Sequence, residues 1–409
     1  MAGRLVAGRL DLVARLPSFR RLFLATLFSG VGTWFAFVAL AIDVKDRTDS
    51  GPWVSALLIA DVLPAVLLGL LVGPLVDRFS RKWLMIGSDV LRAAVFCVLP
   101  FATSAGTIVV LAAVAGIGTG LFRPAVYAGL PNLVEDSELP QANGLIQAVE
   151  NLAWTVGPLV GGLLVAAWGP DVAYWVNAAT FVASAVLLTG IPGRLLQLGT
   201  AESRGHWRDL LAGFSFVLRA RPLLTVLVAW NVFMLASAGI NVAEVFLAKD
   251  TFDAGDFGYG LMVGATGLGL VLGSLGAGSL LERHPVSRVY PGSIMLIALA
   301  VAAGAVAPNV WVAAACILVV GAANGAAVVC NALLVQRGSP DELRGRVFTV
   351  LMSSSFAVLA VGMVVAGPLT DAVGPRWVWG AAAAVAALSS VFALTLSRGV
   401  RAEPVLHPS

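Results

Sequence analysis

The stretch GPLVDRFSRK, Gly73–Lys82, joins two long apolar segments, 53–76 and 83–103, through a short and highly charged connection. Its charged residues are Asp77, Arg78, Arg81 and Lys82. Each flanking segment has the length of a membrane-spanning helix, which needs about 20 mostly apolar residues. So tight and so charged a turn between two membrane-length segments predicts a gate or a hinge at the membrane surface.

The same pattern recurs in the second half of the chain, so an internal duplication is predicted. Three markers return in register: Gly73, Asp77 and Arg78 as Gly278, Glu282 and Arg283; Gly157-Pro158-Leu159 as Gly367-Pro368-Leu369; and Asp136–Leu139 as Pro340–Leu343. Repeats of this length are typical of transporters built from two related halves.

The composition is that of a membrane protein. Of 409 residues, 59% are hydrophobic and 12% are charged, against roughly 25% charged residues in soluble domains. Mean hydropathy is +0.91. Twelve apolar stretches are long enough to span a bilayer: 19–42, 53–76, 83–103, 106–131, 141–168, 171–192, 223–248, 257–281, 288–307, 309–335, 346–370 and 376–397. We therefore predict an all-α polytopic membrane protein with twelve transmembrane helices in two pseudo-symmetric six-helix halves.

The longest polar interruption lies midway along the chain and sets the predicted domain bounds. These are an N-terminal half at 1–192, a cytoplasmic linker at 193–221, a C-terminal half at 222–398 and a cytoplasmic tail at 399–409. Apolar residues recur at helical spacing within the linker: Trp207, Leu210, Leu211, Phe214 and Leu218. This spacing fits an amphipathic helix on the cytoplasmic leaflet, or a linker whose apolar face packs on neighbouring spans.

Basic residues are distributed very unevenly between the two predicted sides of the membrane. With the N-terminus inside, 20 of the 26 basic residues fall in inside segments, and two lie within helices. Only four fall in outside loops: Lys45, Arg47, Lys249 and Arg376. The positive-inside rule then predicts a multi-pass protein of the cell membrane with both termini cytoplasmic. The net charge of +3 reports this topology and not nucleic-acid binding.

The positions of the cysteine, histidine and lysine residues argue against disulfide bonds, metal binding and nucleotide binding. Cys97, Cys316 and Cys330 all fall inside spans, so no disulfide framework is predicted. There is no HExxH motif or Cys/His cluster, and no lysine follows a glycine-rich phosphate-binding loop. We expect no metal, no cofactor and no enzymatic activity, and ATP-driven transport would need a separate subunit.

Three further strings carry a family resemblance. They are LPSFRRLFLATLFSG (Leu16–Gly30), FRPAVYAGLPNLVEDSELPQANGL (Phe122–Leu145) and GPLVGG (Gly157–Gly162). Together with GPLVDRFSRK and the duplicated twelve spans, they resemble the major facilitator superfamily. The closest likeness is to its drug–proton antiporter branch, which includes macrolide, multidrug and siderophore exporters. The resemblance implies a lipid-embedded transporter, expected to be monomeric, that moves a small-molecule substrate and protons by alternating access.

The charged turn has a physical interpretation of its own as a latch. Gly73 follows Gly69 by four residues and permits close helix contact, and Asp77 can accept from backbone N–H groups at a helix N-terminus. The resemblance implies that this terminus belongs to the eleventh span, near 344–347. Arg81, one turn after Asp77, can pair with it. The alternative is a solvated turn that carries positive-inside charges. The candidate gating residues are Gly73, Asp77, Arg78, Arg81, Glu282 and Arg283.

The string GPLVGG places small residues and a proline in the fifth span. Pro158 removes a backbone hydrogen bond, while Gly157, Gly161 and Gly162 allow a partner helix to approach closely. The eighth span offers a small-residue face at four-residue steps: Ala265, Gly269, Gly273 and Ala277. We expect these two faces to meet, although small residues are common in any membrane bundle.

Six charged residues fall inside predicted spans, where each costs at least about 2.5–3.5 kcal/mol and is a functional candidate. They are Asp61, Asp89, Arg92, Arg123, Glu150 and Glu244. The spacing of Asp89 and Arg92 predicts an intrahelical pair, and Glu244 is expected to reach water at the outer end of its span.

Arg123 and Glu150 lie on consecutive spans, roughly 12–14 Å from the cytoplasmic boundary at about 1.5 Å per residue, so a pair is predicted. Many relatives carry an acid after the glycine of the first span, where this chain has Thr33 after Gly32. We therefore assign proton coupling to Glu150 with Arg123, and Asp61, with no cation expected nearby, is the rival. A static Arg123–Glu150 pair that only joins two helices is the structural alternative.

The resemblance implies a central cavity lined by the first, fourth, seventh and tenth spans. Candidate lining residues are Trp34, Phe35, Phe37, Tyr127, Asn231, Met234, Asn324 and Asn331. Aromatic rings and methionine with a few amides suit a bulky, amphipathic ligand, although each could equally serve packing.

The sequence therefore predicts a secondary active transporter that exports bulky, mostly apolar small molecules in exchange for protons. One alternative is a dedicated exporter of a siderophore or secondary metabolite. The other is a non-transporting membrane receptor or scaffold on the same fold.

Overall fold

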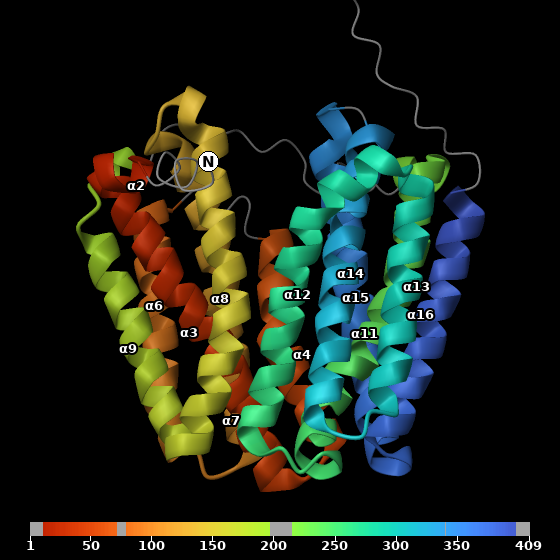
Figure 1. Ribbon diagram of the computed structural model, residues 1–409. Helices are drawn as coiled ribbons and strands as arrows, with labels where there is room; N and C mark the ends of the chain where they lie inside the picture. Colours follow the sequence, from red (N-terminus) through yellow and green to blue (C-terminus); the bar gives the residue numbers. More distant parts are fainter. Residues whose placement is uncertain (1–10, 72–78, 197–214, 340, 398–409) are drawn as a thin grey trace, which may run out of the picture. The chain divides into compact units, whose positions relative to one another are not determined.

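The structure is a computed structural model that describes residues 11–71, 79–196, 215–339 and 341–397 (Figure 1). These residues form long α-helices and short helical turns, and no strand occurs among them. The helices are α2 (Asp11–Arg15), α3 (Pro17–Thr48), α4 (Gly51–Leu71), α6 (Arg81–Val98), α7 (Ala105–Gly129), α8 (Leu139–Trp168), α9 (Pro170–Thr189), α11 (Arg221–Phe246), α12 (Gly255–Arg283), α13 (Val286–Ala305), α14 (Val310–Gly338), α15 (Asp341–Val373) and α16 (Pro375–Ser397).

The long helices match the predicted spans. Within the described ranges, eleven helices are long and apolar enough to cross a membrane. The remaining predicted span is α4, which the structure describes up to Leu71, next to the undescribed residues 72–78. The predicted all-α polytopic membrane fold is confirmed.

Local sequence signals explain where several helices begin. Ser104 caps α7 by accepting from the backbone N–H of Thr107 at 3.2 Å, and Asn309 caps α14 by accepting from Val312 at 3.0 Å. Proline, whose missing N–H costs nothing in the first helical turn, opens α3 and α9. These turns between apolar stretches divide the chain into its separate helices.

The chain divides into two compact units. Unit 1 comprises Met1–Ser203 and Ala248–Gly264, and unit 2 comprises Arg204–Leu247 and Ala265–Ser409, each with its described residues. The start of α12 therefore groups with the first unit. Of the predicted linker helix, residues 197–214 lie outside the described residues, and 215–219 are helical.

Helix packing repeats from one unit to the other. In unit 1, α3 packs against α8 and α9, and α6 packs against α7 and α9. In unit 2, α11 packs against α15 and α16, and α13 packs against α14 and α16. Each helix of the first set is matched by the helix six spans later, as a duplication requires.

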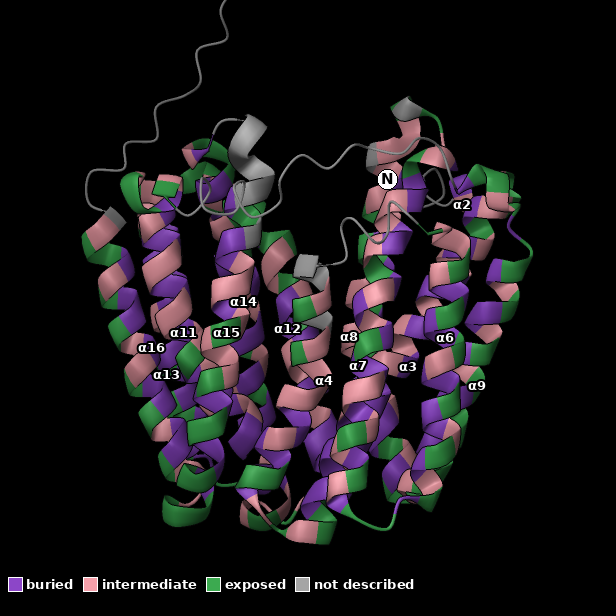
Figure 2. Cartoon of the chain, turned by 180° about the vertical axis from the view of Figure 1, so that it is seen from behind, coloured by how far each residue is buried: buried purple, intermediate pink, exposed green. Residues whose placement is uncertain are grey.

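Burial follows the helix faces. Figure 2 shows buried and exposed stripes on individual helices. Many exposed positions are large and apolar, including Trp83, Phe101, Leu275 and Trp377. Large apolar side chains on an outer face are unfavourable in water and suit a surface that contacts lipid.

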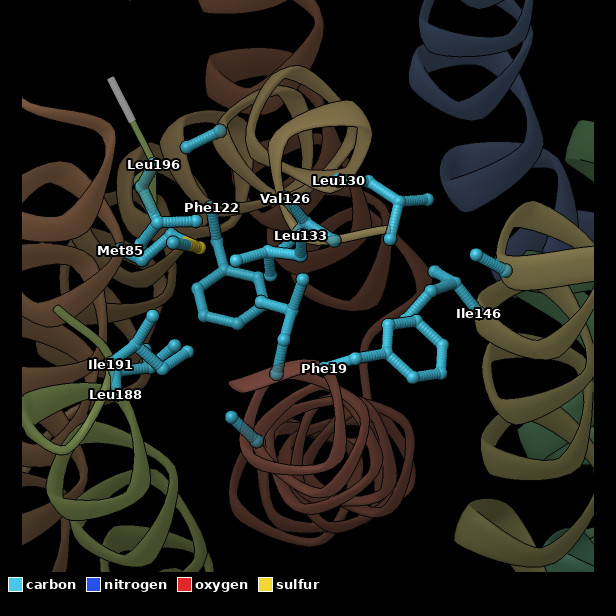
Figure 3. Close-up of a cluster of buried hydrophobic side chains, with 14 of the residues drawn as sticks. Phe19, Met85, Phe122, Val126, Leu130, Leu133, Ile146, Leu188, Ile191 and Leu196 are labelled. Carbon is cyan, nitrogen blue, oxygen red and sulfur yellow. The ribbon is translucent and has the colours of Figure 1, made fainter. Parts of the chain in front are cut away.

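A buried apolar cluster joins the helices of unit 1 at the end that carries α2 (Figure 3). Phe19 of α3 lies beside Ile146 of α8, while Met85 of α6 and Phe122 of α7 complete the centre. Leu188 and Leu196 close it from α9 and the segment after α9. This core fixes α7 and α8, which carry the predicted charged pair.

Candidate functional site

Arg123 and Glu150 meet between α7 and α8. Arg123 Nε donates to Glu150 Oε1 at 3.2 Å, and Nη2 donates to Oε2 at 2.9 Å. The Tyr127 hydroxyl, one turn after Arg123, donates to Glu150 Oε2 at 3.0 Å. The side chain of Arg123 is 63% exposed and that of Glu150 only 19%. The structure thus brings together the predicted pair, with the guanidinium accessible and the carboxylate mostly covered.

Aromatic side chains of α3 and α8 meet close to this pair along α8. Trp34 of α3 stacks on Trp154 of α8 with ring centroids 5.4 Å apart, and Phe37 meets Trp34 edge-on at 5.9 Å. Trp154 follows Glu150 by one helical turn, so both project from one face of α8. Trp154 was not among the predicted cavity residues. Its position four residues after Glu150 places it on the same helix face and could have indicated it.

Phe35 differs from its prediction as a cavity residue. It is 1% exposed and lies in the contact between α3 and α8. A Cβ at Gly161 would come within 2.6 Å of the Phe35 carbonyl oxygen, and one at Gly157 within 2.7 Å of Trp34 Cβ. Phe35 is therefore a packing residue in this structure, and the GPLVGG glycines hold α8 against α3.

Gly162 makes a second close contact, with the start of α12 in unit 1. A Cβ there would lie 2.8 Å from the Asp256 carbonyl oxygen and from Gly260 Cα. The predicted face of Ala265, Gly269, Gly273 and Ala277 belongs to unit 2. Gly269 and Gly273 instead pack on α14 beside Ala322. A stripe at four-residue steps predicts a close neighbour, but it does not say which neighbour.

The predicted intrahelical pair of α6 is fully enclosed. Arg92 Nη2 lies 2.5 Å from Asp89 Oδ1, and the two residues are 2% and 0% exposed. Arg92 also donates to Ser29 Oγ at 2.9 Å and to Thr33 Oγ1 at 3.3 Å, and it stacks over Phe181 at 4.3 Å. This network ties α6 to α3 and α9.

Asp61 is half-buried on α4, and its surroundings differ from the prediction in one respect. The guanidinium of Arg92 lies close enough to act electrostatically on the Asp61 carboxyl. Asp61 therefore shares a cation with Asp89, where the sequence suggested no cation nearby. Spacing along one helix could not reveal this relation because it joins α4 to α6.

Three of the six predicted gating residues lie in the described part of the chain, and three do not. Gly73, Asp77 and Arg78 lie outside the described residues, as do the side chains of 341–346. Arg81 Nη1 donates to the Ala128 carbonyl at 2.9 Å, and Lys82 Nζ donates to the carbonyls of Thr189 and Ile191, both at 2.7 Å. These cations thus cap carbonyls at the ends of α7 and α9. Glu282 and Arg283 are exposed at the end of α12.

The predicted amides of unit 2 retain unused hydrogen-bonding capacity. Asn231 Nδ2 donates to the Leu227 carbonyl at 2.6 Å and to Ser354 Oγ at 3.1 Å. The buried Oδ1 atoms of Asn231, Asn324 and Asn331 accept no hydrogen bond from the described part of the chain. Unpaired buried acceptors are costly, so these are candidates to bind a donor on a ligand. Met234, one turn after Asn231, is half-buried.

A charge network missed by the sequence analysis joins the end of α3 to the segment before α12, within unit 1. Lys249 Nζ lies 2.6 Å from Asp46 Oδ1 and 2.5 Å from Asp256 Oδ1. Lys45 pairs with Asp250 and is only 8% exposed, where an outer loop was predicted. The reason is that α3 continues to Thr48, so these residues occupy its last turns. No group of three or more His, Cys, Asp or Glu suited to a metal occurs among the described residues.

Comparison with solved structures identifies the fold. The nucleoside transporter NupG superimposes with a TM-score of 0.79 at 13% identity, covering 92% of this chain and 99% of that one. A transporter of the peptide-transporting POT family superimposes with a TM-score of 0.77 at 11% identity, over 95% of this chain and 99% of that one. At such identities the likeness shows the fold alone. The molecule has the fold of multi-pass transporters of the major facilitator type.

The sequence places it more narrowly. Residues 14–404 match the family described as transmembrane secretion effector, and the chain belongs to that family. It is similar to the multidrug efflux pump Tap of Mycobacterium tuberculosis, at 28% identity over 384 residues and 88% of each chain. It is also similar to macrolide efflux protein A of Streptococcus pyogenes, at 22% identity over 355 residues, covering 82% of this chain and 85% of that one.

Proposed function

We propose that this protein exports bulky, mostly apolar drugs across the cell membrane in exchange for protons, by alternating access. The observation that carries the proposal is the Arg123–Glu150–Tyr127 group next to the Trp34–Trp154 stack. A titratable pair and an aromatic surface on neighbouring faces can couple proton binding to the binding of a flat or apolar ligand. The similarity to multidrug and macrolide efflux proteins supports a drug substrate.

In the proposed coupling of proton and drug transport, Glu150 alternates between two environments, one with the Arg123 guanidinium beside it and one without. A low-dielectric environment favours the neutral carboxyl, whereas a nearby guanidinium favours the carboxylate. When Arg123 is drawn to a substrate or to water, Glu150 is left to take up a proton. When Arg123 returns, the carboxylate is stabilised and the proton is released. Asp61, which shares Arg92 with Asp89, is the rival carrier.

The rest of the proposal follows the charge distribution of the sequence. Both termini and the linker lie in the cytoplasm, and the transporter works as a monomer in the bilayer. The turn at 73–82 serves as the cytoplasmic latch. The predicted aromatic and amide side chains, Phe35 excepted, contact the substrate.

Transport into proteoliposomes with an acidic lumen tests this function. We expect labelled erythromycin to accumulate against its gradient, and accumulation to vanish when an ionophore collapses the pH difference. A resistance panel in a pump-deficient host then measures substrate breadth. Export of a single siderophore or secondary metabolite would favour a dedicated exporter. No transport of any compound under either gradient would favour a receptor or scaffold.

A further inference from the structure

Glu244, near the end of α11, is a buried acid that the proposed proton pathway does not use. Its position near the outer end of the span suggested contact with water, but the structure leaves it only 5% exposed. Its Oε1 atom is buried and accepts no hydrogen bond from any described residue. Its neighbours in sequence, Val242, Ala243, Val245 and Phe246, are buried as well. The carboxyl group is thus enclosed with at least one oxygen unpartnered.

No ion pair with this carboxyl occurs among the residues that the structure describes. The elements packed on α11 are α14, α15 and α16. The charged residues on the same end of these helices are Asp371 and Arg376, and neither makes a hydrogen bond or ion pair with Glu244. Arg376 donates to the carbonyls of Ala305 and Ala307. Arg337 lies at the other end of α14. An ionised carboxylate held in this way costs several kcal/mol, so the arrangement suits the protonated form.

The segment that follows Glu244 is unusual. Residues Leu247–Thr251 form a π-helical turn, a rare conformation that is frequent at functional sites. The chain leaves unit 2 and enters unit 1 between Leu247 and Ala248. Within the turn, Lys249 pairs with Asp46 and Asp250 pairs with Lys45. The part of this turn that belongs to unit 1 is therefore held to the end of α3 by ion pairs.

We propose that Glu244, buried at 5% exposure with Oε1 unpartnered, is a second proton-binding group, which takes up a proton from the outer side. The inference rests on the proposed proton exchange. When water reaches the carboxylate, the group binds H⁺ and becomes a neutral carboxyl. The neutral form is the one that a buried, unpartnered position favours. Renewed contact with water allows the proton to leave.

Infrared difference spectroscopy tests the protonation itself, without transport. We expect the spectrum of the wild-type protein minus that of Glu244→Gln, at neutral pH, to contain the C=O band of a protonated carboxyl. Asp253→Asn, which removes an exposed acid nine residues later along the chain, is the control and should leave this band unchanged. A difference spectrum with a carboxylate band, or with neither band, would overturn the proposal. If Glu244→Gln does not fold, Glu244→Met takes its place.

Transport separates this role from the proposed function. Glu244→Gln should lose accumulation driven by the pH difference, down to the level of empty vesicles, and keep erythromycin exchange in the absence of a gradient. Uphill accumulation by Glu244→Gln would overturn the role of Glu244 and leave proton exchange standing. If accumulation by the wild-type protein does not depend on the pH difference, the proposed proton exchange is refuted. A role of Glu244 in transport is then refuted with it.

Discussion

Arg123 of α7 and Glu150 of α8 are joined by two hydrogen bonds, at 3.2 and 2.9 Å, and Tyr127 adds a third to the same carboxylate. The fork of the guanidinium fixes the carboxylate in one orientation, which makes this pair stronger than a single charge contact. A pair of this kind can hold two helices together, or it can be opened by a ligand. The two roles differ in what happens when the charge on Glu150 is removed.

We predict that Glu150→Gln abolishes efflux driven by a pH gradient while substrate binding is preserved. The amide keeps the size of the side chain but cannot exchange a proton. Drug accumulation in proteoliposomes and equilibrium binding to purified protein measure the two properties. Glu135→Gln, which neutralises an exposed acid between α7 and α8, should behave as the wild type. If Glu150→Gln still drives uphill efflux, the Arg123–Glu150 pair is structural and Asp61 becomes the carrier.

The enclosed pair of α6 should matter for stability. Arg92→Met leaves Asp89 buried without its cation, which typically costs about 3–5 kcal/mol. Asp89→Asn combined with Arg92→Met removes both charges, so we expect most of the melting temperature to return. The matched control is Glu138→Gln, which breaks the partly exposed Arg15–Glu138 pair and should change little. A double variant as unstable as Arg92→Met alone would show that Asp89 is not the source of the cost.

Much of the fold could be predicted because each span carries its own signal. An apolar stretch of about 20 residues between charged turns is a local property, and the three repeated markers reveal the duplication. The predicted helix bounds were less accurate where charged residues lie in the last turns of a helix. Lys45 was placed in a loop, but α3 continues to Thr48, so Lys45 lies in its last turn and pairs with Asp49 and Asp250.

The site was predictable only where two residues lie on consecutive spans or on one helix. Arg123–Glu150 and Asp89–Arg92 could be inferred from depth and spacing. The Asp61–Arg92 relation, the partner of Gly273 and the burial of Glu244 depend on which helix faces which. Hydropathy is similar all around α4, α11 and α12, so the sequence pattern does not orient these helices.

The contact between α8 and α3 should be sensitive to a single methyl group. A Cβ at Gly161 would lie 2.6 Å from the Phe35 carbonyl oxygen, so Gly161→Ala forces the backbones apart at a cost of about 1–3 kcal/mol. Gly144 on the same helix has no atom within 4 Å of an added Cβ. Gly144→Ala should therefore leave stability unchanged or raise it by up to about 1 kcal/mol. Melting temperatures of the purified variants compare the two, and equal values would refute close packing at Gly161.

The latch is tested at Asp77, which lies outside the described residues. Asp77→Asn should abolish transport while membrane insertion remains normal, because the amide loses the charge that favours a helix N-terminus. Asp77→Glu keeps that charge and should retain more activity. Drug accumulation and the amount of protein in the membrane are the measurements. If Asp77→Asn exports drug at the wild-type rate, Asp77 has no latch function.

Topology can be tested with single cysteines in a background that lacks Cys97, Cys316 and Cys330. The uneven distribution of basic residues predicts that Arg204 lies in the cytoplasm and that Asp253, which is exposed before α12, lies outside. A membrane-impermeant maleimide should therefore label Asp253→Cys on intact cells, and Arg204→Cys only after permeabilisation. Labelling of Arg204→Cys on intact cells would invert the topology. It would also move Glu244 to the cytoplasmic side, where a proton would be released and not taken up.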